Sequence, residues 1–155
     1  MTLINVHREC IDTLDLTPAK VTIEKLVQQG QLSPAIGLQF AILYDRALGD
    51  PREFSEIPEI RLWFVRLDGV YPWLPYILDW RSELARYTAM LVPHQFSPQD
   101  GIVYNPEALE IFLMGKLFII WDWQKQRGET NSEKLQQMAL ALGFEVDRGL
   151  FSLLG

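Results

Sequence analysis

The opening residues alternate between apolar and polar positions, and the pattern then changes to a helical spacing. The alternation over residues 3–11 predicts a strand. Thr17 followed by Pro18 is a typical helix start, and Gly30 is a typical helix end. These signals predict a helix over residues 18–29.

The central part of the chain is predicted to contain further strands. Residues 35–48 fit either a buried strand or a short helix, and a strand is favoured. The acidic, proline-containing segment 50–58 is expected to be a loop. Residues 60–68 carry aromatic and β-branched side chains on both sides of an alternating pattern, which predicts a strand covered on both faces.

Two prolines stiffen the YPWLP segment at residues 71–75, because each fixes one backbone angle and restricts the residue before it. Residues 76–80 and 84–92 are then expected to form the two strands of a hairpin. In the alternative interpretation, Ser82 caps a short helix that begins at Glu83.

The clearest helix is predicted over residues 106–125, because an Asn-Pro-Glu start leads into a long apolar run. Gly115 inside this helix weakens it by about 1 kcal/mol. A second helix is expected to begin at residue 131 or 132 and to run to Gly143. Residues 144–154 are expected to form a final strand or an extended tail.

Strands and helices are thus mixed without regular alternation, which is typical of the α+β class, with a mainly antiparallel sheet packed with helices. With 155 residues the chain has the size of one ordinary domain, so residues 1–155 are expected to form a single domain. Trp63 and Phe118 are both expected in its core.

The composition is that of a globular protein, with 48% hydrophobic and 22% charged residues. The net charge of −6 argues against nucleic acid and against anionic lipid, and it favours a basic or neutral partner. The most apolar run, residues 111–121, is interrupted by Lys116 and is too short to insert across a membrane, so it is core or a docking helix. The first ten residues lack signal-peptide or transit-peptide character, and the chain is expected to stay where it is made.

The residues that bind cofactors and metals are scarce. A lone Cys10 cannot form an internal disulfide or supply the thiolates of a zinc or iron–sulfur site, and it is expected to be a small buried hydrophobe. His7 and His94 are far apart, and no phosphate-binding loop or nucleophile motif is present. The sequence therefore predicts no cofactor, no metal and no catalytic residue.

An enzyme or a small-molecule-binding protein remains as the alternative function. His94 could act as a general base in a cleft with Asp79 and Arg86. The structural interpretation is favoured instead: His94 orders a proline-bounded turn, and Asp79 pairs with Arg86 or Arg81.

The stretch from residue 59 to residue 96 is predicted to be the functional surface. It holds eight of the eighteen aromatic residues, interleaved with arginines and carboxylates. Tryptophan, tyrosine and arginine dominate interface hot spots, and a stiff segment presents them with little entropy to lose.

Six motifs in and after this stretch resemble the Chlororespiratory Reduction 6 family of cyanobacteria and chloroplasts. They are LWFVRLD at 62–68, YPWLP at 71–75, DW at 79–80, ELARY at 83–87, MLVPHQ at 90–95 and NPEALE at 105–110. The resemblance implies maturation of NdhI, the iron–sulfur subunit of the photosynthetic NADH dehydrogenase-like complex, and assembly of that complex's hydrophilic arm. It also implies a protein that is not an enzyme and that works in the cytoplasm of a cyanobacterium, beside the thylakoid.

The aromatic stretch and the resemblance together indicate the residues that contact the NdhI subunit or its assembly intermediate, whereas the oligomeric state stays open. The ten candidate partner-binding residues are Arg66, Asp68, Tyr71, Trp73, Asp79, Trp80, Arg86, Tyr87, His94 and Gln95. Because one thiol cannot carry a cluster, the help given to the client is expected to be holding rather than cluster delivery.

Overall fold

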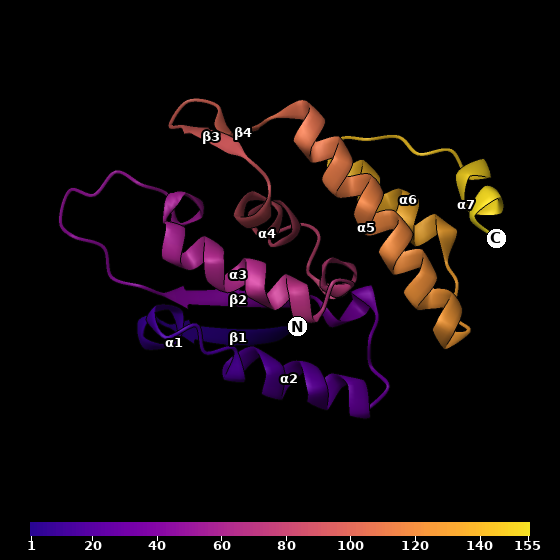
Figure 1. Ribbon diagram of the computed structural model, residues 1–155, viewed down its shortest axis with the longest axis horizontal. Helices are drawn as coiled ribbons and strands as arrows, with labels where there is room; N and C mark the ends of the chain where they lie inside the picture. The colour runs from indigo at the N-terminus through magenta and orange to yellow at the C-terminus, as the bar shows by residue number, and fades with distance from the viewer.

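The computed structural model describes residues 1–155 (Figure 1). Its strands are β1 (Thr2–His7), β2 (Leu38–Leu43), β3 (His94–Ser97) and β4 (Gly101–Tyr104). Its α-helices are α1 (Arg8–Asp12), α2 (Thr17–Gln28), α3 (Pro58–Val70), α4 (Leu84–Leu91), α5 (Pro106–Arg127), α6 (Ser132–Ala141) and α7 (Gly149–Leu154). Three short 3-10 helices are η1 (Pro34–Ile36), η2 (Phe54–Glu56) and η3 (Leu74–Ile77).

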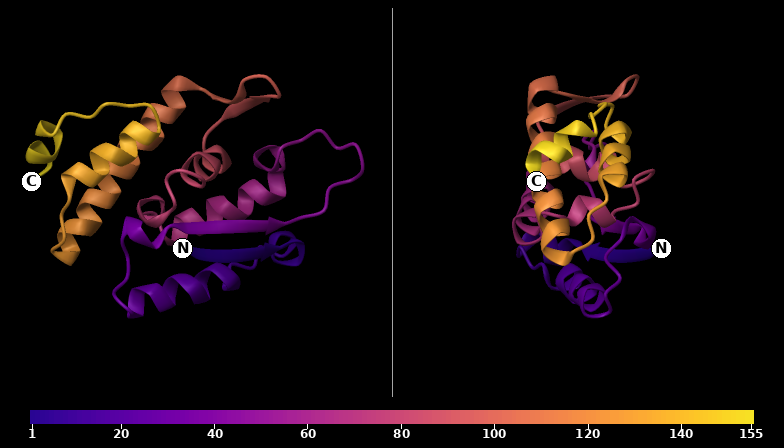
Figure 2. Two further views of the ribbon diagram at one scale, coloured as in Figure 1. Left: turned by 180° about the vertical axis from the view of Figure 1, so that it is seen from behind. Right: turned by 90° about the vertical axis from the view of Figure 1, so that its right-hand side faces the viewer.

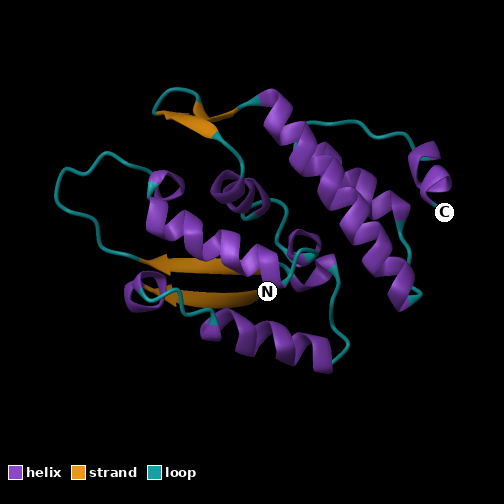
Figure 3. Cartoon of the chain, in the orientation of Figure 1, coloured by secondary structure: helices purple, strands orange, loops and turns teal.

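The predicted α+β class is confirmed, but the sheet differs from the expectation. β1 and β2 pair in parallel over their whole length, connected through α2. β3 and β4 form a separate antiparallel hairpin. Instead of one mainly antiparallel sheet there are therefore two pairs of strands among many helices, because several segments expected as strands are helical (Figure 3).

Helices cover one face of the β1–β2 pair. Ile4, Val6 and Phe40 lie on that face and are buried, whereas Leu3 and Leu43 on the opposite face are about half exposed. α2 and α3 lie next to the strands, and the α5–α6 pair lies beyond α4 with α7 at its outer end (Figures 1 and 2). No helix has both the length and the apolar character needed to cross a membrane.

The expected strand over residues 60–68 is wrong, because these residues lie in α3. The buried residues of α3 are Ile60, Trp63, Phe64 and Leu67, which follow the 3.6-residue period of a helix. Pro58 occupies the first turn, where a helix tolerates proline. The same residues also satisfy an alternating pattern over a short window, and this ambiguity misled the strand prediction.

The expected hairpin of residues 76–80 and 84–92 is also wrong. The first segment continues from η3 into a bend, and the second contains α4. The alternative prediction of a helix near Glu83 is confirmed, with Glu83 rather than Ser82 at the N-cap position. The Asp79 carbonyl accepts hydrogen bonds from the backbone N–H groups of Glu83 and Leu84 and thereby forms the turn before α4.

The remaining elements follow the sequence closely. The strand predicted over residues 3–11 ends at His7, because residues 8–12 form α1, and the strand predicted within residues 35–48 is β2. The helices predicted over 18–29, 106–125 and 131–143 are present. Asn105 and Asn131 cap α5 and α6 by accepting backbone N–H bonds at 3.0 Å. The final segment is not a strand, since residues 149–154 form α7.

The core runs from β1 to α7 and includes 30 buried apolar residues. Trp63 is fully buried against the rings of Phe40 and Phe64, as expected. The core assignment of Phe118 is wrong, because this side chain is 43% exposed on the outer face of α5. α5 is apolar on nearly all sides, so its sequence did not reveal which face is inside.

Candidate partner-binding site

Five aromatic side chains form a continuous series where the segment after α3 meets α5. Trp73 stacks on Trp123 with ring centroids 4.8 Å apart and planes 8° apart. Tyr71 contacts Trp73 edge-on at 5.7 Å, and Tyr76 contacts Trp123 at 5.8 Å. Tyr76 in turn meets Trp80 at 6.3 Å. The structure therefore brings together the predicted Tyr71, Trp73 and Trp80, and it adds two aromatic residues that the sequence analysis missed.

Hydrogen bonds and a cation hold this aromatic series in place. The Trp80 indole N–H donates to the Pro75 carbonyl at 3.1 Å, and the Tyr71 hydroxyl donates to Glu24 on α2 at 2.7 Å. Burial, with Glu24 adding to it, raises the pKa of Tyr71 well above its ordinary value. The Arg127 guanidinium lies over the Trp123 ring at 4.8 Å.

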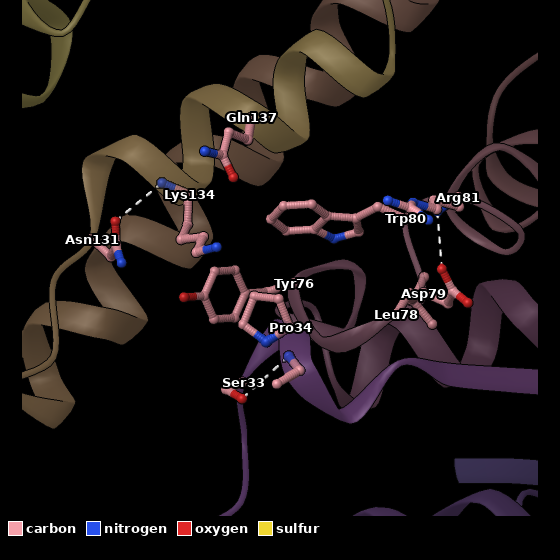
Figure 4. A pocket seen from close by; sticks show the side chains of 11 residues that line it. Ser33, Pro34, Tyr76, Leu78, Asp79, Trp80, Arg81, Asn131, Lys134 and Gln137 are labelled. Carbon is pink, nitrogen blue, oxygen red and sulfur yellow. Dashed lines mark hydrogen bonds between the residues drawn. The ribbon is translucent and has the colours of Figure 1, made fainter. Parts of the chain in front are cut away.

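A pocket of about 680 Å³ opens at the Trp80 end of the series (Figure 4). Tyr76 and Trp80 lie on one side, and Lys134 and Gln137 of α6 lie on the other. A second pocket of about 280 Å³ shares three of its lining residues with the first, namely Ser33, Tyr76 and Asn131. We call the two together the aromatic groove.

Several polar groups of the aromatic groove lack a partner within the protein. The side-chain nitrogens of Arg81 and Lys134 make no hydrogen bond and no ion pair. Gln124 is 1% exposed; its oxygen accepts the Asn131 backbone N–H at 3.1 Å, but its Nε2 has no partner. An unpaired donor at such a depth is costly, and a ligand group in the groove could satisfy it.

Asp79 lines the aromatic groove but is already engaged. Its carboxylate accepts bonds from the Gln39 amide at 2.9 Å and from the Arg81 backbone N–H at 3.0 Å. These hydrogen bonds lower the pKa of Asp79, and the bond from Gln39 has the largest effect. The Asp79 carboxylate is therefore an anion at neutral pH. Its predicted side-chain pairing with Arg86 or Arg81 is wrong, because neither side chain reaches it.

Three of the predicted residues have their polar groups bonded within the fold: Tyr87 is buried, and Asp68 and Arg86 are partly buried. Asp68 accepts two bonds from Lys116 of α5, both at 2.7 Å, and one from the Tyr87 hydroxyl at 2.9 Å. Arg86 donates to the Phe40 carbonyl at 3.2 Å and lies 3.6 Å from Glu83. We infer structural roles for Asp68, Arg86 and Tyr87, because their polar groups form hydrogen bonds or ion pairs with other residues of the fold.

The last three predicted residues lie away from the aromatic groove. Arg66 is exposed on α3, and Gln95 is exposed on β3. His94 lies 3.0 Å from the Val92 carbonyl through Nδ1 and 3.0 Å from the Ser55 hydroxyl through Nε2. Ser55 is fully buried, so this pair orders a turn and does not present a nucleophile to solvent.

The cleft required by the alternative function does not form. Asp79 lines the larger pocket of the aromatic groove, His94 lines a separate pocket beside β3 and β4, and Arg86 lines neither. No group of three or more His, Cys, Asp or Glu side chains is placed to hold a metal ion.

Sequence reasoning missed the residues supplied from the C-terminal half of the chain. Trp123 lies in α5 just after the apolar run 111–121 and carried no separate signal. Lys134 and Gln137 are ordinary polar positions of α6, and only their approach to Trp80 makes them part of a site. The Gln124 donor could be recognised only from its burial.

The chain was also compared with known proteins. No solved structure matches it. Residues 6–153 match the family described as chlororespiratory reduction 6, so the match extends well beyond the motifs of residues 62–110 to nearly the whole sequence. The protein therefore belongs to the chlororespiratory reduction 6 family.

Proposed function

We propose that this protein binds the NdhI polypeptide and holds it during assembly of the hydrophilic arm of the NADH dehydrogenase-like complex. Membership of the chlororespiratory reduction 6 family supports a role in assembly of the chlororespiratory NADH dehydrogenase-like complex. This is an assembly-factor family and not a known enzyme family. The proposed place of action is the cytoplasmic face of the thylakoid.

The main structural support for this proposal is the composition of the aromatic groove. Trp80 is half-buried, and Arg81 and Lys134 beside it are unpaired cations. A rigid aromatic anchor flanked by adaptable polar groups is the arrangement that binds a polypeptide segment with an apolar side chain and a nearby carboxylate. An incompletely folded client offers such segments before its own core closes over them.

Holding the client is favoured over cluster delivery by the chemistry of the single thiol. Cys10 is only partly buried and not the buried residue that the sequence predicts. Partial desolvation, together with the nearby Asp15 and Glu9 carboxylates, raises the pKa of Cys10 above its ordinary value. The thiolate is the form that ligates iron, and it is therefore disfavoured here. We accordingly propose neither a resident cofactor nor a catalytic step.

Substitutions in the aromatic groove should weaken NdhI binding without unfolding the protein. We expect Trp80→Ala to lower the affinity for purified, cluster-free NdhI by about thirtyfold, the equivalent of about 2 kcal/mol for an interface anchor. Lys134→Glu should also weaken binding and make it less dependent on salt, because it reverses an unpaired charge. Binding is measured by fluorescence anisotropy, and folding by thermal melting.

Lys25→Glu on α2 is the matched control, since Lys25 is also an exposed helical lysine without a side-chain partner. It should leave the affinity unchanged. Wild-type affinity in the Trp80 and Lys134 variants would show that NdhI binds elsewhere on the protein. Absence of NdhI binding by the wild type would contradict the proposed function.

A further inference from the structure

The outward face of α5 exposes a row of apolar side chains. Ile111 is 74% exposed and Phe118 is 43% exposed, and their seven-residue spacing places them on one side of the helix. Trp123, Gln124 and Arg127, which line the aromatic groove, lie on other sides of the same helix. The outward face is therefore a second surface, separate from the groove.

Gly115 lies between the two exposed side chains on this face. A Cβ atom added to Gly115 would meet no atom within 4 Å, and its backbone angles do not require glycine. Neither packing nor geometry within the protein thus explains a glycine in the middle of a 22-residue helix, where it weakens the helix relative to alanine. A backbone that approaches α5 closely from outside would explain it, because the distance between packed helices is set by the side chains at their contact.

The charges around this face are mainly acidic. Glu107, one turn before Ile111, and the neighbouring Glu110 have no ion-pair partner. Asp122, one turn after Phe118, accepts a hydrogen bond from Gln126 at 2.9 Å. Two cations follow Asp122 in the last turn of α5. Lys125 directs its ammonium to the Leu154 carbonyl at 3.4 Å, and Arg127 lies over the Trp123 ring on another side of the helix.

We infer that the outward face of α5 docks an amphipathic helix of the client, crossing at Gly115, with apolar residues against Ile111 and Phe118 and a Lys or Arg near Glu107. The inference rests on the proposed function, because the client is taken to be NdhI. The client would then contact the protein at two surfaces of different chemistry, the aromatic groove and the outward face of α5. The open space beside Gly115 and the acidic end of the face are the features that define this occupant.

A second copy of the chain is the less suitable occupant. Glu107 precedes Gly115 by eight residues and Asp122 follows it by seven, so two antiparallel copies crossing at Gly115 would place these carboxylates near each other. Two parallel copies would place Glu107 beside Glu107. Like charges disfavour both arrangements.

Gly115→Gln separates a docking role from a structural one, because its effects on stability and on binding should have opposite signs. Glutamine is the better helix former and has open space at this position, so the melting temperature should stay equal or rise. The affinity for purified NdhI should fall by at least about tenfold, because the new side chain holds the partner helix away. Gly115→Ala should produce a smaller loss in the same direction.

Gly69→Gln is the matched control, since Gly69 also lies in a helix with open space around it and no unusual backbone angle. Ile111→Ser should weaken binding as well, whereas Val21→Ser at a similarly exposed position of α2 should not. If the wild type binds NdhI and Gly115→Gln binds equally well, the docking inference is overturned and the proposed function stands. If the wild type does not bind NdhI, both the docking inference and the proposed function are contradicted. A wild-type dimer that Gly115→Gln converts to a monomer would identify a second copy as the occupant and would also overturn the inference.

Discussion

Replacing Trp63 by alanine is expected to lower the free energy of unfolding by about 4 kcal/mol, because it empties the centre of the core. Trp63 is fully buried and packs against Phe40 and Phe64, with ring centroids 6.3 and 5.0 Å away. Its indole N–H donates to the Asp15 carbonyl at 2.8 Å, so the substitution also leaves that carbonyl without its partner. Urea denaturation followed by circular dichroism measures the loss, and little soluble protein is expected at 37 °C.

Phe118→Ala is the matched contrast, because it removes another large aromatic side chain from a helix. Phe118 is 43% exposed, so we expect a loss of less than about 1 kcal/mol. Equal losses for the two variants would contradict the orientation of α5. An unchanged stability of Trp63→Ala would contradict the position of α3 against the β1–β2 pair.

Lys116→Met is expected to cost about 3 kcal/mol, because it leaves a poorly solvated carboxylate without its cation. The Lys116 side chain is 7% exposed and that of Asp68 is 19% exposed. The ammonium of Lys116 also donates to the Pro72 carbonyl at 2.9 Å and thereby ties α5 to the segment after α3. Burial raises the pKa of Tyr87 well above its ordinary value, so its hydroxyl stays protonated and continues to donate to Asp68.

The double variant Lys116→Met, Asp68→Asn distinguishes charge from packing. It removes the uncompensated charge and keeps an oxygen that can accept from Tyr87, so it should be more stable than Lys116→Met alone. Lys125→Met on the exposed side of the same helix should change the stability by less than about 0.5 kcal/mol. A double variant as unstable as the single one would show that methionine does not fit the site and that charge is not the cause.

The sequence was sufficient where local signals agree with the fold. The caps of α5 and α6 and the start of α2 at Thr17 and Pro18 are local features, and the structure confirms each. The secondary-structure prediction for α3 was wrong because Trp63 and Phe64 are adjacent and both buried. Two adjacent buried residues fit a strand that is covered on both faces as well as a broad helical face. In the helix, both side chains contact Phe40 of β2, and this contact between distant parts of the sequence could not be predicted from the local pattern.

The candidate site was predictable only in part for a similar reason. Tyr71, Trp73 and Trp80 lie close together in the sequence and were identified as a group. Asp68 and Tyr87 belonged to the same set of motifs, yet Asp68 pairs with Lys116 of the distant α5, and Tyr87 packs against Phe40 and Phe64 in the core. Residue type alone does not distinguish an aromatic or charged side chain at a surface from one that a distant helix covers.

The amount of NdhI in cells that lack this protein tests most directly whether the protein assists the NdhI subunit. We expect mature NdhI and the assembled hydrophilic arm to decrease together in the deletion strain, whereas the NdhI transcript stays at its normal level. Wild-type protein supplied in trans should restore both, and the Trp80→Ala variant should restore them poorly. Normal amounts of NdhI and of the assembled arm in the deletion strain would contradict the proposed function.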